Sequence, residues 1–349
     1  MKRLDLLATS VIAAALAVAA AALAQSPATP AYKVVNAVPL GGPDRWDYVV
    51  HDGATQRVYV AHGDRVSVVD VKNAKVIGEV TGITGGTHGI GVSNATGKGY
   101  TDDGKGGLAV VFDLKTFEVL KRIEAKEDAD AIAFDAKSGH VFVVDGDSKA
   151  LTVIDPATDT VIATIDTGGG METAVAGGDG KLYVNGAKNK ELVRVDIKTN
   201  MIDARWPLPD CASPHGLAFD PFAHRAFVTC INKLMTVVNT DTGAVVAALP
   251  IGLGSDAAAF DPSRKRAFSS NADGTLSIIQ EVDPNTFVSL GSIKTAQGGR
   301  TMSIDHKTGR LFIAAADMQP AGPPGPDGKP ARPKPVPGSL KLLFLDPQN

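Results

Sequence analysis

The sequence predicts an all-β protein that folds as a seven-bladed β-propeller with four-stranded antiparallel blades, and three observations carry this prediction. A short apolar segment that ends in an acidic or amide residue recurs seven times along the chain. Each repeat contains four runs of β-branched and apolar residues separated by turn residues. No amphipathic helix pattern follows the N-terminal region. Four antiparallel strands in about 40 residues, repeated without helices, are typical of propeller blades.

The recurring segment defines the spacing of the blades. Its first five copies end 41 to 43 residues apart. The seven copies are Val68–Asp70, Val111–Asp113, Val153–Asp155, Arg194–Asp196, Val237–Asn239, Ile278–Glu281 and Leu343–Asp346. In the third repeat the expected strands are Ala131–Phe134, His140–Val144, Leu151–Ile154 and Thr160–Ile165. A single blade cannot bury both of its faces, so neighbouring blades must stack and the ring must close.

We expect the ring to be closed by a strand from the N-terminal part of the chain. The seventh repeat stops after its third strand, at Lys341–Leu345. Tyr32–Leu40 resembles the fourth strands of other repeats, such as Val76–Val80. Pairing of Tyr32–Leu40 with Lys341–Leu345 would complete the last blade and remove an exposed sheet edge.

Residues 1–24 have the pattern of a cleavable signal peptide. Lys2 and Arg3 precede the apolar run Leu6–Leu23, and the small residues Ala22 and Ala24 predict cleavage after Ala24. A retained anchor is the alternative, because the run is nearly long enough to span a bilayer. No second apolar run of that length occurs, so no membrane span is expected in the mature protein. Residues 25–349 are expected to form one periplasmic or secreted domain.

The net charge of the chain argues against one class of partner. Cleavage after Ala24 removes two basic residues and one acidic residue, which moves the formal charge from −3 to −4. Nucleic acid is therefore not the expected partner, because phosphate binding favours a basic surface.

Cys211 and Cys230 are the only cysteines. In an oxidising compartment this pair predicts a disulfide, with free or metal-bound thiols as the alternative.

Aligning the repeats places one polar residue at the start of each innermost strand. These seven residues, called the charged ring below, are Asp47, His88, Asp130, Glu172, His215, Asp256 and Arg300, and Trp46 lies beside them. Innermost strands line the axial channel, so the seven side chains are expected to converge at one mouth. Carboxylates crowded together raise one another's pKa unless a cation intervenes.

Three interpretations of the charged ring stay open. It is a solvated or self-paired ring, a pocket for a small molecule or anion, or a site for a divalent metal ion. His88, Asp130, Glu172 and His215 are the candidate metal ligands. No HxxxH, HExxH or Cys/His spacing supports a metal independently. A divalent metal ion is therefore a candidate cofactor, but no sequence motif assigns it.

The last repeat carries a Pro- and Gly-rich insertion at residues 319–339. Its composition buries too little apolar surface to fold alone and predicts an extended loop. It lies in the loop between the second and third strands of this repeat, on the face of the propeller that carries the charged ring. The insertion is expected to be an unstructured loop. The alternative is a flap over the channel mouth, in which Lys329, Arg332 and Lys334 contact the acidic residues of the charged ring.

Several second strands resemble the Tyr-Val-Thr-Asn signature of the YVTN-repeat, or YncE-like, β-propeller family. They are Tyr183–Asn185, Phe227–Cys230 and Phe268–Asn271. The resemblance covers nearly the whole mature chain and implies the fold strongly and the activity weakly. The absence of recurrent Trp-Asp dipeptides distinguishes the chain from tryptophan–aspartate-repeat scaffolds.

The function expected from these features is that of an exported, monomeric, non-catalytic binding module. Its charged ring would face a small molecule, a metal ion or a protein partner. The resemblance also implies two alternatives. In a lactonase-like enzyme, a metal held by Asp130, Glu172 and a histidine would polarise a carbonyl group. A single-stranded DNA-binding propeller would need an aromatic and basic track, whereas aromatic residues are only 5% of the chain.

Overall fold

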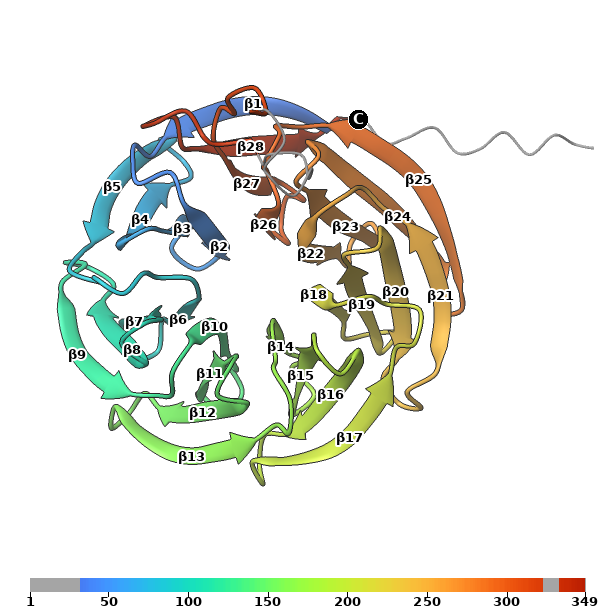
Figure 1. Ribbon diagram of the computed structural model, residues 1–349, viewed down its shortest axis with the longest axis horizontal. Coiled ribbons are helices and arrows are strands. Elements are labelled where there is room, and N and C mark those ends of the chain that lie inside the picture. The colour runs from blue at the N-terminus through green and yellow to red at the C-terminus, as the bar shows by residue number, and fades with distance from the viewer. Residues whose placement is uncertain (1–31, 323–332, 349) are drawn as a thin grey trace, which may run out of the picture.

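The computed structural model describes residues 32–322 and 333–348. Its strands form seven sheets of four antiparallel strands, arranged around a central axis (Figure 1). This confirms the seven-bladed β-propeller that the repeat predicts. The described residues contain no helix that is both long enough and apolar enough to cross a membrane. The predicted signal peptide, residues 1–24, lies outside the described part of the chain.

The first three blades run from the innermost to the outermost strand in chain order. Blade 1 consists of β2 (Trp46–Asp52), β3 (Arg57–His62), β4 (Arg65–Asp70) and β5 (Lys75–Val80). Blade 2 consists of β6 (Ile90–Ser93), β7 (Lys98–Asp103), β8 (Leu108–Asp113) and β9 (Val119–Glu124). Blade 3 consists of β10 (Ala129–Phe134), β11 (Val141–Asp145), β12 (Ala150–Asp155) and β13 (Thr160–Asp166).

The next three blades repeat this order. Blade 4 consists of β14 (Ala174–Ala176), β15 (Lys181–Gly186), β16 (Glu191–Asp196) and β17 (Met201–Pro207). Blade 5 consists of β18 (Pro214–Asp220), β19 (Arg225–Cys230), β20 (Leu234–Asn239) and β21 (Val245–Pro250). Blade 6 consists of β22 (Ser255–Asp261), β23 (Arg266–Asn271), β24 (Thr275–Asp283) and β25 (Thr286–Lys294).

Blade 7 joins the two ends of the chain, as predicted. It consists of β26 (Thr301–Ile304), β27 (Leu311–Ala315), β28 (Lys341–Pro347) and, outermost, β1 (Tyr32–Pro39). β1 pairs antiparallel with β28 from Tyr32 opposite Pro347 to Pro39 opposite Lys341. The backbone groups at this edge of β28 are therefore satisfied by the N-terminal strand (Figure 1).

The core lies between the faces of adjacent blades, and a repeated aromatic residue fills it. The second strand of each blade contributes one almost fully buried ring: Tyr59, Tyr100, Phe142, Tyr183, Phe227, Phe268 and Phe312. Tyr32 of β1 packs edge-on against Phe268, with ring centroids 5.5 Å apart, and so joins blade 7 to blade 6. Burial of each such ring contributes about 1.5–3 kcal/mol.

The predicted disulfide between Cys211 and Cys230 is present. Cys230 ends β19 and Cys211 precedes β18, and their Cα atoms are 5.2 Å apart. The bond therefore ties the entrance of the innermost strand of blade 5 to the end of the second strand.

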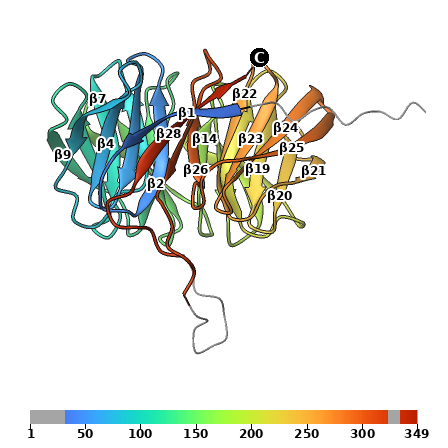
Figure 2. The same ribbon diagram turned by 90° about the horizontal axis from the view of Figure 1, so that it is seen from above.

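The ends of the Pro-rich insertion form a short stem that leaves one face of the ring (Figure 2). The Gln319 amide donates to the Lys334 carbonyl at 2.8 Å. The Gly338 and Leu340 amides donate to the Asp44 carboxylate, just before β2, at 2.6 and 3.0 Å. Of the three cations in the proposed flap, Lys329 and Arg332 lie outside the described residues, and Lys334 is exposed.

Candidate functional site: a charged ring at one mouth of the channel

The structure places the seven residues of the charged ring at or just before the starts of the innermost strands, and each is half-buried. Glu172 Oε1 of blade 4 lies 3.9 Å from His215 Nε2 of blade 5. Arg300 Nε of blade 7 forms a 3.0 Å ion pair with Asp256 Oδ2 of blade 6. Side chains from four consecutive blades thus meet at one mouth of the channel.

Glycine allows the innermost strands to approach closely at this mouth. A Cβ atom at Gly89 would lie 2.3 Å from the Asp130 carbonyl oxygen of the next blade. A Cβ atom at Gly216 would lie 2.5 Å from the Ala257 carbonyl carbon. These glycines directly follow His88 and His215, so close backbone packing positions both imidazoles.

Three members of the charged ring lie close enough together to share one metal ion. One ligand atom from each of Glu172, His215 and Asp256 lies within 4.8 Å of the other two. Glu172 and His215 are among the ligands suggested by the sequence, whereas Asp256 was expected only as a ring member. His88 and Asp130 do not belong to this group.

A hydrogen bond fixes the tautomer of His215. Its Nδ1 atom lies 2.9 Å from the Ser213 carbonyl oxygen, which can only accept a hydrogen bond. Nδ1 must therefore carry a proton, and the lone pair of the neutral ring is on Nε2, the atom that approaches Glu172. Orientation of an imidazole by a carbonyl group is typical of histidines that bind metals.

His88 is engaged by a buried carboxylate that the sequence analysis missed. Its Nδ1 atom lies 2.8 Å from Asp102 Oδ2, and Asp102 Oδ1 accepts the His88 and Gly89 amides. Arg45 Nη2 lies 3.3 Å from the other ring nitrogen. Burial opposes protonation of His88, but the bond to Asp102 and the charges of Asp102, Asp130 and Asp47 raise its pKa to about 9.

The carboxyl groups of Asp47, Asp130 and Glu172 are harder to ionise than usual, chiefly because they are buried. Burial and the charge of Asp256 raise the pKa of Asp47 to about 7, although His88 and Arg300 oppose the shift. Burial and the charge of Asp47 also raise the pKa of Asp130. Burial raises the pKa of Glu172. Within residues 32–322 and 333–348, no hydrogen bond reaches the carboxylate of Asp47 or Asp130.

The side chain of Tyr48 lies next to the charged ring and extends across the channel. Its hydroxyl group reaches across the axis from blade 1 and lies 2.8 Å from Thr173 Oγ1 of blade 4. Burial, together with the charges of Asp130 and Glu172, raises the pKa of Tyr48 well above its usual value, so the hydroxyl stays protonated. The sequence contained a signal for this role. The residues that follow the other six ring members are all small: Gly89, Ala131, Thr173, Gly216, Ala257 and Thr301.

Trp46 lies in the core beside the charged ring rather than in it. Only 8% of its surface is exposed, and it packs with Leu340 and Met318 between blades 7 and 1. A Cβ atom on Gly298 would lie 3.3 Å from the indole ring. Trp46 therefore anchors the stem of the Pro-rich insertion near the mouth.

Comparison with known families finds relatives without an assigned activity. A family model described as a domain of unknown function (DUF5074) matches residues 54–226. A protein of Salmonella typhimurium named uncharacterized protein YncE is 29% identical over 224 residues, and a protein of the same name from Salmonella typhi is 28% identical. Each alignment covers 61% of this chain and 60% of the relative, so the chain spans less than two thirds of the length of these relatives.

Solved structures share the architecture at low sequence identity. A chain of Kuenenia stuttgartiensis hydrazine synthase matches with a TM-score of 0.67 at 15% identity, covering 77% of this chain and 92% of that one. A chain of a mitotic checkpoint complex matches with a TM-score of 0.71 at 15% identity, covering 100% and 99%. At these identities the likeness shows the fold alone.

Proposed function

Because the chain is a YncE-like seven-bladed β-propeller protein, we propose that it is an exported, non-catalytic binding module whose charged ring holds a divalent metal ion. The observation that carries this proposal is the convergence of Glu172, His215 and Asp256, with their ligand atoms within 4.8 Å of one another. Two carboxylate oxygens and one imidazole nitrogen are ordinary ligands for divalent ions. Positions left open on the ion would take water or a ligand carried by a partner.

The surrounding groups suit this role. The Ser213 carbonyl orients His215 so that Nε2 offers its lone pair. Arg300 holds Asp256 through Oδ2, which leaves Oδ1 available. Burial, and after it the charge of neighbouring carboxylates, raises the pKa of Asp47 and Asp130, and a bound cation would favour their ionised forms.

The mixed ligand set favours a transition ion over calcium. Calcium takes six to eight oxygen ligands, whereas imidazole suits zinc and related ions. One imidazole and two carboxylates therefore point to Zn²⁺ or Mn²⁺. Export is supported by the Cys211–Cys230 disulfide, since such bonds persist in oxidising compartments.

Titration of chelator-treated protein with Zn²⁺ and Mn²⁺, followed by calorimetry, tests the proposal. We expect one ion to bind per chain and His215→Ala to weaken binding by about tenfold or more, because a ligand is lost. His224→Ala is the matched control, since His224 pairs with Asp241 in an outer turn. A protein that binds neither ion, or that binds equally well without His215, would contradict the assignment.

The enzymatic and nucleic-acid alternatives stay predictions. A lactone hydrolysis screen of the metal-loaded protein, with His215→Ala as control, separates a hydrolase from a binding module. A salt titration of oligonucleotide binding addresses the third possibility, because phosphate contacts weaken steeply as salt rises. Neither hypothesis gains support from a particular contact in the described residues.

A further inference from the structure

We propose that the opposite mouth of the channel is a second ligand site, which binds a small uncharged aromatic molecule. A cavity of about 390 Å³ lies there, within the range of small-molecule pockets. The walls of this aromatic cavity come from the innermost strands of blades 4 to 7. They include Val175, Ala176, Phe219, Ala258, Phe260 and Met302.

The aromatic cavity is separate from the charged ring. On β18, His215 of the ring and Phe219 of the cavity are four residues apart, which is about 13 Å along a strand. Between the two levels, Tyr48 spans the channel to Thr173. The two mouths therefore offer different chemistry, and this inference does not depend on the proposed metal site.

Two rigid aromatic side chains shape the cavity. The ring of Phe219 stacks on Tyr183 at a centroid distance of 4.7 Å, and the Tyr183 hydroxyl donates to Asp179 at 2.8 Å. The ring of Phe260 stacks on Phe227 at 5.1 Å. Side chains already locked by stacking lose little entropy when a ligand binds, so these walls are preorganised for a flat apolar molecule.

Several apolar side chains in the wall of the aromatic cavity are partly exposed to solvent. Val175, Ala176, Phe219 and Ala258 are half-buried although they lie in the interior of the ring. Apolar surface left in a concave site often marks a ligand position. An aromatic ligand would remove this surface from water.

The polar end of the cavity favours an uncharged ligand with one hydrogen-bonding group. A second cavity of about 320 Å³ shares Ser303, Ile304 and His306 with the first and adds His51. Burial lowers the pKa of the half-buried His51, so its imidazole is neutral at pH 7, whereas His306 is exposed at the rim of the cavity. His51 Nε2 is buried and has no hydrogen-bond partner within the described chain. Ser303 and the two histidines are neutral or rim groups that suit one carbonyl or hydroxyl group on the ligand.

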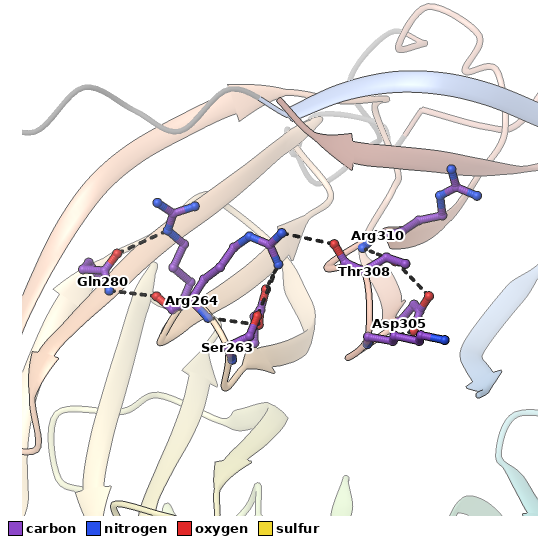
Figure 3. Close-up of polar contacts among 9 residues, drawn as sticks. Ser263, Arg264, Gln280, Asp305, Thr308 and Arg310 are labelled. Atoms are coloured by element: carbon purple, nitrogen blue, oxygen red, sulfur yellow. Dashed lines mark hydrogen bonds and ion pairs between the residues drawn. The ribbon is translucent and has the colours of Figure 1, made fainter. Parts of the chain in front are cut away.

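Arginines in the adjoining turns are already paired, which argues against an anionic ligand. Arg264 binds the Asp261 carboxylate at 2.8 Å and the Thr308 carbonyl at 3.2 Å (Figure 3). Arg310 forms an ion pair with Asp346 at 2.5 Å. Lys307 borders the second cavity but is exposed, so its ammonium group stays hydrated.

Fluorescence titration with N-phenyl-1-naphthylamine, an uncharged probe, tests the proposal on the full mature chain. We expect one probe molecule to bind per chain, equally with and without chelator. Ala258→Trp, which fills the cavity, is expected to weaken binding by about tenfold or more. Ala157→Trp, in an exposed turn, is the matched control.

Three outcomes would overturn the proposal: no saturable binding, equal binding by Ala258→Trp, or tighter binding of the anionic probe 8-anilinonaphthalene-1-sulfonate. Thermal unfolding of each variant shows whether it is folded. If Ala258→Trp fails to fold, Ala176→Leu provides a smaller obstruction of the same wall. Loss of metal binding through His215→Ala with retained probe binding would show that the two sites are independent.

Discussion

At the scale of single residues, equivalent positions of the repeat have different roles because their neighbours come from different blades. His88 and His215 occupy the same position in blades 2 and 5. His88 is held by the buried carboxylate of Asp102, whereas His215 is held by a backbone carbonyl and keeps Nε2 free. The first is therefore a charge partner within the protein, and the second is suited to bind a ligand.

His88 makes stability depend on pH. Its folded-state pKa of about 9 lies above the ordinary value of 6.5, so its stabilising contribution is complete below pH 6.5 and is lost as the pH rises through 9. Burial raises the pKa of the partner carboxyl, Asp102, so the net effect of the pair on the unfolding free energy is smaller than the shift of His88 alone implies.

Urea unfolding between pH 8 and 10, above the folded-state pKa of about 7 of Asp47, measures this dependence in the presence of chelator. His88→Asn is expected to flatten the loss of stability over that range, while His224→Asn should preserve it. An unchanged slope in His88→Asn would show that another group causes the loss.

At the scale of the element, the Cys211–Cys230 bond joins the innermost and second strands of blade 5 near the charged ring. It closes a loop with a sequence separation of 19 residues. Replacing both cysteines with serine is expected to lower the unfolding free energy by about 3 kcal/mol, because the unfolded chain gains conformational freedom.

Chemical unfolding of the double serine variant, compared with the oxidised and reduced wild-type protein, measures this contribution. The reduced wild type should resemble the variant. Equal stability of all three would mean that packing around blade 5 makes the bond redundant.

At the scale of the whole molecule, closure of the ring depends on one strand. β1 contributes the buried side chains of Tyr32 and Val38, which together account for about 3–6 kcal/mol. A chain that starts at Leu40 would expose the edge of β28 and the face of Phe268. We expect this truncation to lower the unfolding temperature and to promote self-association.

Size-exclusion chromatography with light scattering and thermal unfolding would test this expectation. A chain that starts at Tyr32 is the control, because it retains all of β1. A monomeric, equally stable chain without β1 would show that blade 7 is complete with three strands.

The sequence alone determined the number of blades, the closing strand and the disulfide, whereas the binding role of the charged ring stays a prediction. The blades and the closing strand follow from local periodicity, because the spacing of strands and turns repeats along the chain. The disulfide follows from the presence of two cysteines in a chain expected to be exported. Only the tertiary structure decided which ring members meet. It selected Asp256 instead of His88 and Asp130 beside Glu172 and His215, and it brought Tyr48 to Thr173, 125 residues away. It also formed the aromatic cavity from four blades. Such contacts depend on the curvature of the ring and on side-chain packing between distant repeats, which no periodicity encodes.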